Sequence, residues 1–141
     1  MITQQGNKIY GYASVFNVVD QQGDIILPGA FIDSIEQFEG GKKIILLWQH
    51  QYDQPVGVVD QMIEDAYGLY IQASITQSTQ SGKEAFELIK HEVINGFSIG
   101  YEVNQVEYSD YNTTRYINNI NLIEISLVTF PANQEAVITG Y

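Results

Sequence analysis

Short apolar runs separated by polar and glycine-rich breaks make up most of this chain, and the runs have the length of β-strands. A first strand is predicted over residues 8–19, where β-branched and aromatic residues are frequent. A polar break at residues 20–24 ends it. Residues 43–49 form a nearly continuous apolar run, which is typical of a strand that is buried on both sides.

The same pattern continues toward the C-terminus. Residues 56–63 and 68–75 predict a β-hairpin, because two strand-like runs flank a short polar turn. Three further strands are predicted over residues 96–108, 115–121 and 122–130. A polar turn at Ser109–Thr113 separates the first two, and Pro131 stops the last.

Two segments have helical periodicity instead. In residues 30–38, Phe31, Ile35 and Phe38 share one helical face, and two glycines follow. The second helix is predicted to begin at Ser81, which stands three residues before Glu84 as in a capping box, and to end near Val93.

These elements predict one domain over residues 1–141 of the mainly β, α+β class. The predicted strands outnumber the helices and mostly follow one another directly. We therefore expect a closed or nearly closed β-barrel with two helices packed outside it.

Composition limits the chemistry. The chain has 141 residues, 45% of them hydrophobic, and no cysteine, so a thiolate nucleophile and a cysteine-based zinc site are excluded. Its formal charge of −11 repels phosphate backbones, and we expect no nucleic-acid partner. We also expect no membrane segment and, because residues 1–6 lack the features of a secretory signal, an intracellular site of action.

The stretch from Gly96 to Tyr101, GFSIGY, places a serine between apolar neighbours with a glycine two residues away on each side. Side chains alternate along a strand, so Ser98 is predicted to point away from Tyr101, toward the space beside Gly96 and Gly100. Glycines weaken a strand, which indicates that a ligand or another backbone comes close. Ser98 is a candidate nucleophile; the simpler interpretation is a small residue on a half-exposed strand.

A nucleophilic serine needs a base and a third group that orients the base. The chain has two histidines. His91 falls on the polar side of the predicted second helix, whereas His50 follows a buried strand into a polar loop. His50 is therefore the candidate base; a structural histidine bonded to loop carbonyls is the alternative.

Glu124 lies at the centre of an otherwise apolar predicted strand. Burying a carboxylate is costly unless it is paired, so this position predicts a partner. His50, Arg115 or a lysine could supply it, or Glu124 could face solvent. Ser126 lies on the same predicted face two residues later and is either a rival nucleophile or a supporting hydrogen-bond donor.

Taken in order, several short motifs resemble those of the prohead proteases of tailed bacteriophages, which are capsid-maturation serine proteases similar to herpesvirus assemblins. The matching pieces are Asp20-x-x-Gly-Asp24, Pro28-Gly-Ala-Phe31, Leu47-Trp-Gln-His50, Pro55-Val-Gly57, Gly68-Leu69, Gly96-Phe-Ser-Ile-Gly100, Glu124-Ile-Ser-Leu-Val128 and Pro131-Ala-Asn133. Each motif alone is weak, but together they span nearly the whole chain.

The resemblance implies that His50 is the general base, Ser98 the nucleophile and Glu124 the third member, at the position where assemblins have a second histidine. It implies a barrel surrounded by helices. It also implies a serine endopeptidase that cleaves the scaffold protein, or the scaffold-like segment of the major capsid protein, and itself. This would take place within the assembling procapsid in the host cytoplasm. We expect no cofactor and no metal, and the sequence leaves a homo-oligomer open.

Other readings stay open at this point. The domain could be a non-catalytic virion assembly or decoration module in which Ser98 is merely small. Two more use different side chains: a metal site built from His50 and Asp53 with Glu64 or Asp60, and a Ser-Lys dyad with Lys83 or Lys90. The absence of a close histidine pair disfavours the metal site, and the lysines fall on a predicted solvated helix.

Overall fold

The apolar runs of the sequence become strands in the computed structural model, which describes residues 7–109 and 113–141. Within these residues the strands are β1 (Lys8–Val15), β2 (Asp24–Ile26), β3 (Ile45–Trp48), β4 (Gln51–Glu64), β5 (Gly68–Ile75), β6 (Gly96–Tyr108), β7 (Arg115–Val128) and β8 (Ile138–Gly140), and the helices are α1 (Ile32–Glu39) and α2 (Gln80–Lys90).

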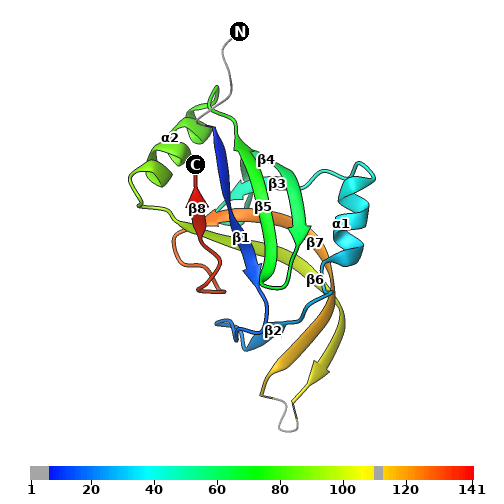
Figure 1. Cartoon of the computed structure of the whole chain (residues 1–141). Helices are drawn as coiled ribbons and strands as arrows, with labels where there is room; N and C mark the ends of the chain where they lie inside the picture. The colour runs from blue at the N-terminus through cyan, green and yellow to red at the C-terminus, as the bar shows by residue number, and fades with distance from the viewer. Residues whose placement is uncertain (1–6, 110–112) are drawn as a thin grey trace.

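All of these strands join one sheet. Its order is β2-β7-β3-β4-β5-β1-β8, and β6 pairs with β7 in addition. Strands β2 and β3 run parallel to β7, whereas the other ladders are antiparallel. In Figure 1, β1, β4 and β5 cross over β6 and β7, and the two helices lie on opposite sides of the view. Strand β7 therefore links the two parts of the sheet.

Strand β8, at one end of the strand order, approaches the start of β6 without forming a ladder with it. Gly96 and Val137 form an isolated bridge, and the Ile138 amide donates to the Asn95 carbonyl at 2.8 Å. Strand β8 has only three residues, and its ladder is with β1 and not with β6. The ladder stays open, and the predicted barrel closure is not confirmed. The coarser prediction holds, because the chain is α+β, mostly sheet, with two helices in the described residues.

The inner face of the sheet forms the core. Leu46, Phe97, Ile125 and Leu127 are each fully buried there, as strand alternation requires. Helix α2 adds its apolar face, which consists of Ala85, Phe86 and Ile89. This packing fixes β3, β6 and β7 side by side, and the candidate site lies on their outer face.

Helix boundaries differ from the prediction at α2. The cap is Thr79, whose hydroxyl accepts the Gly82 amide at 3.1 Å, so Ser81 already lies inside the helix. The helix ends at Lys90, and Val93 is left 58% exposed. Thr79, two residues before Ser81, caps the helix because its hydroxyl satisfies a backbone amide of the first turn.

Strand boundaries also differ. β7 is one strand of 14 residues where two strands were expected, and it ends at Val128. β1 ends at Val15, because Asn17 adopts a left-handed φ of 63°. β4 begins at Gln51, five residues before its predicted start. The predicted turn at residues 109–113 lies partly outside the described residues.

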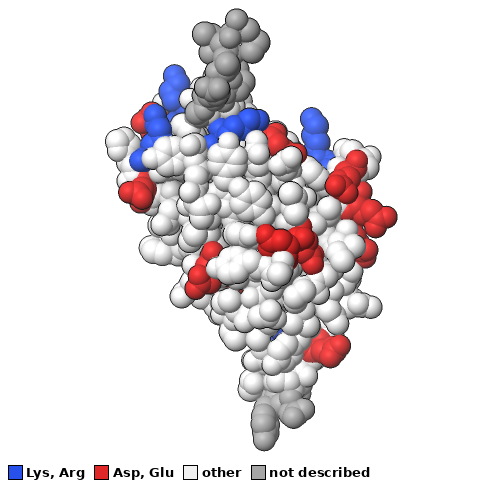
Figure 2. All heavy atoms as spheres, viewed as in Figure 1, with Lys and Arg blue, Asp and Glu red and all other residues white. Residues whose placement is uncertain are grey.

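The charged side chains on the face drawn in Figure 2 do not gather into a single patch. Figure 2 shows acidic side chains in separate groups on one face, with wide uncharged areas between them. None of the described helices is long and apolar enough to cross a membrane.

Candidate active site

A cleft of about 480 Å³ lies beside β6. His50, Ser98 and Glu124 all line it, although they come from the β3–β4 turn, β6 and β7. The fold therefore brings together the three residues that the sequence singles out. Their mutual geometry determines what the cleft can do.

A tight turn holds His50. Trp48 pairs with Gln51, so Gln49 and His50 alone form the hairpin loop, and both have positive φ, 52° and 60°. This matches a two-residue hairpin turn, yet positive φ is disfavoured for such side chains and persists only where the surroundings hold it. The Gln49 amide donates to the Leu127 carbonyl at 2.9 Å, which fastens the turn to β7.

Side chains fasten the same turn a second time. The Gln49 side-chain amide donates to the Thr129 hydroxyl at 2.7 Å. The His50 backbone amide donates to the Ser126 hydroxyl at 2.9 Å. The imidazole is thus delivered to the outer face of β7 by a turn that β7 itself stabilises.

Glu124 has the partner that its buried position requires. Its Oε2 atom lies 2.6 Å from His50 Nδ1, and its Oε1 accepts the Ser126 hydroxyl at 2.8 Å. Only 5% of the Glu124 side chain is exposed. The hydrogen bond to Glu124 raises the pKa of His50, and partial burial of the ring opposes that shift.

Strand register places Ser98 on the same face. Ser98 lies opposite Ser126, and Gly100 lies opposite Glu124. Directly opposed residues of an antiparallel pair point to one face, so the Ser98 hydroxyl shares the face of the His50–Glu124 pair. Among the hydrogen bonds of the described residues, none joins Ser98 to His50. Because Nδ1 faces Glu124, Nε2 is the nitrogen left to exchange a proton.

The glycines beside Ser98 have a different explanation from the one expected. A Cβ at Gly96 would come within 2.8 Å of the Pro131 ring, and a Cβ at Gly100 would overlap the Glu124 carboxylate. Two side chains of this chain thus occupy the space that the sequence analysis assigned to a ligand or another backbone.

Ser126 is engaged on both sides. Its hydroxyl donates to Glu124 and accepts from the His50 amide, and the residue is fully buried. The predicted shared face with Glu124 is confirmed by this contact. The arrangement favours a supporting role for Ser126 over attack on a substrate.

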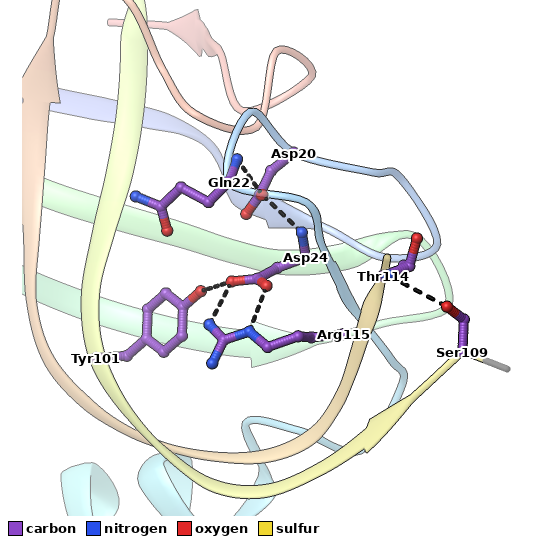
Figure 3. Close-up of polar contacts among 7 residues, drawn as sticks. All are labelled: Asp20, Gln22, Asp24, Tyr101, Ser109, Thr114 and Arg115. Atoms are coloured by element: carbon purple, nitrogen blue, oxygen red, sulfur yellow. Dashed lines mark hydrogen bonds and ion pairs between the residues drawn. The ribbon is translucent and has the colours of Figure 1, made fainter. Parts of the chain in front are cut away.

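The far end of the cleft is polar and was not predicted. Figure 3 shows the Asp24 carboxylate between Arg115 and Tyr101. Arg115 donates from Nε at 2.7 Å and from Nη2 at 2.8 Å, and the Tyr101 hydroxyl donates at 3.2 Å. Burial and the nearby Asp24 charge raise the pKa of Tyr101. Arg115 is thus the partner of Asp24, not of Glu124.

This network explains the motif Asp20-x-x-Gly-Asp24. The Asp20 side chain accepts the backbone amides of Gln22 at 2.8 Å and of Asp24 at 3.0 Å, which shapes the loop before β2 (Figure 3). Burial raises the pKa of Asp20. The motif fixes one wall of the cleft, and its only sequence signal was the family pattern itself.

The competing site predictions find little support. His91 is exposed and lies 3.6 Å from Glu87, which also pairs with Lys90. Glu64 accepts the backbone amides of Gly29 and Phe31. In residues 7–109 and 113–141, no group of three or more His, Cys, Asp or Glu side chains is placed to hold a metal ion.

Comparison with protein families decides the assignment. The model of the family described as caudovirus prohead serine protease matches residues 1–140. This chain belongs to that family. The resemblance found in the sequence is confirmed.

Two prohead proteases are among its relatives. The chain is 38% identical over 132 residues to that of Enterobacteria phage HK97 and 31% identical over 129 residues to that of Escherichia phage T5. Each match covers 92% of this chain but only 58% and 60% of those proteins, so the chain spans about three fifths of their length. A further relative is the capsid polyprotein of Pseudomonas phage PAJU2, 33% identical over 103 residues, covering 69% of this chain and 15% of the polyprotein.

Solved structures agree on the fold of this prohead protease family member. The bacteriophage T4 capsid assembly protease superposes with a TM-score of 0.71 at 13% identity, covering 86% of this chain and 80% of its own. The KSHV protease bound to a hexapeptide phosphonate inhibitor gives 0.64 at 13% identity, covering 93% and 63%. At such identities the likeness shows the fold alone, and it confirms the assemblin-like architecture.

Proposed function

We propose that this chain is a serine endopeptidase domain that acts by a triad of Ser98, His50 and Glu124. The observation that carries the proposal is the 2.6 Å contact between His50 Nδ1 and Glu124 Oε2 in the cleft that Ser98 also lines. Membership in a family of prohead serine proteases supports it. The three residues match the nucleophile, base and orienting group that acyl transfer needs.

The chemistry follows from these contacts. The Ser98 Oγ forms a bond to the scissile carbonyl carbon while its proton passes to His50 Nε2. Glu124 holds the imidazole by Nδ1 and stabilises the positive charge that the ring acquires. The ring then gives that proton to the leaving amine as the C–N bond breaks. Water attacks the acyl-enzyme with the roles reversed and frees Ser98.

Two features bear on the missing contact between Ser98 and His50. Hydrogen bonds between catalytic groups are often long in a free enzyme and tighten only when substrate binds. The His50 backbone amide bonds to Ser126 and its Nδ1 bonds to Glu124, so the ring is held in the cleft that Ser98 also lines. We expect a bound peptide to shorten the distance between His50 Nε2 and the Ser98 hydroxyl.

We propose that the substrate is a scaffold protein or the scaffold-like segment of a major capsid protein, and that the domain also cuts itself. Cleavage would take place inside the procapsid within the host cytoplasm. The names of the relatives support this: two are prohead proteases, and a third is a capsid polyprotein that contains a related segment. No cofactor enters the mechanism.

A labelling experiment tests the nucleophile directly. The purified chain is treated with a fluorophosphonate, and the modified residue is located by mass spectrometry. We expect the label on Ser98 and no label in Ser98→Ala, while Ser81→Ala, an exposed helix serine, labels as the wild type does. A label at another serine, or none at any residue, contradicts the proposed triad.

A further inference from the structure

The outer face of β3 carries apolar side chains that the described residues cover only in part. Residues 43–49 predict a strand buried on both sides, and Leu46 and Leu47, on opposite faces, are 0% and 4% exposed. Ile45 is 38% exposed, and its neighbours Ile123 and Tyr52 are 40% and 72% exposed. Half-covered sheets normally carry polar residues on their open face. An apolar surface is therefore left open around Ile45.

These side chains form a groove of about 410 Å³. It is lined by Ile45, Leu47, Tyr52, Pro55, Ile123 and Glu124. Leu47 pairs with Pro55 on β4 and with Ser126 on β7, so the groove follows the strand order from β4 through β3 to β7. Its walls are mostly the outer face of the sheet.

The groove continues into the catalytic cleft. Tyr52, Ile123 and Glu124 line both hollows. Ser98 on β6 lies on one side of the Glu124 strand, and Leu47 on β3 lies on the other. Because the two hollows share these residues, a peptide with its scissile bond at Ser98 can extend past Tyr52 and Ile123 into the groove.

A bulge shapes this junction. Gly100 pairs with Glu124 and Tyr101 pairs with Leu122, so Ile123 is left without a partner on β6. Bulges re-aim side chains and are frequent beside active sites. Here the extra residue puts an apolar side chain at the boundary between the two hollows.

We propose that this groove is a specificity subsite that takes one aliphatic or aromatic side chain of the substrate peptide. The inference rests on the proposed function. Neighbouring strands lie about 4.8 Å apart, so β3 is about 10 Å from β6, and an extended peptide covers that span in roughly three residues. The apolar residue therefore lies about three positions from the scissile bond.

The chemistry of the groove favours an apolar occupant. Among the described residues that line the groove, Glu124 alone is charged, and its carboxylate is already paired with His50 and Ser126. A charged side chain of the substrate would lose water there and gain no partner. A second copy of this chain is the other conceivable occupant, and the experiment separates the two.

The test uses the wild-type chain and an unbiased mixture of peptides made by digesting a bacterial proteome. Cleavage sites are read by mass spectrometry. We expect enrichment of Leu, Ile, Val, Met or Phe at one position about three residues from the cut. A synthetic peptide from that set is then compared with its analogue that carries Asn at this position. The apolar peptide should have a kcat/KM roughly 10- to 200-fold higher.

Matched variants locate the subsite. Ile45→Thr combined with Ile123→Thr should reduce that ratio by about tenfold or more, because the groove loses its apolar lining. Ile63→Thr is the control, since Ile63 is an isoleucine of β4 that is 52% exposed and lines neither hollow. It should leave the ratio unchanged.

The outcomes separate this inference from the proposed function. The subsite is overturned, while the proposed protease stands, if the cleavage sites show no apolar enrichment. The same conclusion follows if the double variant Ile45→Thr, Ile123→Thr keeps the wild-type ratio of kcat/KM between the apolar peptide and its Asn analogue. The groove is assigned to a second copy of the chain if the wild type forms a dimer that the double variant abolishes and if the kcat/KM ratio between the two peptides is unchanged in that variant. Absence of any cleavage together with absence of Ser98 labelling overturns both.

Discussion

Gly100 lies directly opposite Glu124 across the β6–β7 ladder, and a Cβ at Gly100 would overlap the Glu124 Oε2 atom. That oxygen is the one that contacts His50 Nδ1. The glycine after Ser98 therefore provides the space in which the carboxylate reaches the imidazole. The sequence motif around Ser98 and the position of Glu124 are two parts of one packing arrangement.

Gly100→Ala tests this relationship. The new methyl group displaces Glu124, and we expect kcat/KM for a cleaved peptide to fall roughly 100-fold, since small misplacements of catalytic groups have effects of that size. Gly40→Ala is the control, because a Cβ there meets only ordinary contacts of 3.4 Å at the end of α1. Wild-type kcat/KM in Gly100→Ala would mean that the Glu124 position is not needed for activity.

Ser126→Ala tests whether Ser126 supports the His50–Glu124 pair or is itself the nucleophile. The Ser126 hydroxyl links the His50 backbone to Glu124, so its loss should lower kcat by roughly 10- to 100-fold while fluorophosphonate still labels Ser98. Ser98→Ala should abolish both cleavage and labelling. If instead Ser126→Ala loses the label and Ser98→Ala keeps it, Ser126 is the nucleophile.

The Asp24–Arg115 pair predicts a stability effect. The Asp24 side chain is fully buried, so Arg115→Met leaves a carboxylate with Tyr101 as its remaining side-chain donor. We expect a loss of about 2–3 kcal/mol in the free energy of unfolding, at the low end for a broken buried pair because the Arg115 side chain is 39% exposed.

Urea unfolding measures this loss, and a second ion pair supplies the control. Lys8 and Asp60 lie 3.2 Å apart with 34% and 29% of their side chains exposed. Lys8→Met should therefore cost no more than about 1 kcal/mol. Equal effects of the two substitutions would show that the Asp24 pair contributes no more than a surface pair.

The sequence could predict what depends on local pattern. Residues 96–108 become β6 within their predicted bounds, and residues 68–75 become β5. The sequence also predicts that Glu124, if buried, needs a partner, because burying an unpaired charge is costly in any fold. In the structure, His50 is the partner of Glu124, and Arg115 bonds to Asp24 instead.

Other features depend on long-range pairing and could not be predicted. Strands β2 and β8 have three residues each and form only because β7 and β1 lie alongside. Tyr101 lines the same cleft as Ser98 because its hydroxyl reaches Asp24, a residue 77 positions earlier in the chain, and local pattern gives no sign of that contact. In the apolar run of β3, Leu46 and Leu47 are buried as predicted, but Ile45 is 38% exposed and lines the groove.

Glu124→Gln tests the electrostatic role of the carboxylate. The hydrogen bond to Glu124 is the main cause of the raised pKa of His50, and partial burial of the ring acts in the opposite direction. Removing the charge should therefore lower the pKa of His50, which NMR of the imidazole protons measures, with His91 as the internal control. Because the raised pKa favours the charged ring in the folded protein, the pair stabilises the fold at low pH. That stabilisation is lost as the pH rises through the pKa of His50.

The same shift sets the pH dependence of catalysis. His50 accepts a proton from Ser98 only when it is neutral, so the acid limb of kcat/KM in the wild type should lie above the ordinary histidine value of about 6.5. In Glu124→Gln the limb should move to lower pH, while the maximal rate falls roughly 1,000-fold because the imidazolium is no longer stabilised and the tautomer no longer fixed. A lower rate with an unmoved acid limb would indicate that Glu124 acts on the position of His50 alone. An unchanged rate would remove Glu124 from the triad.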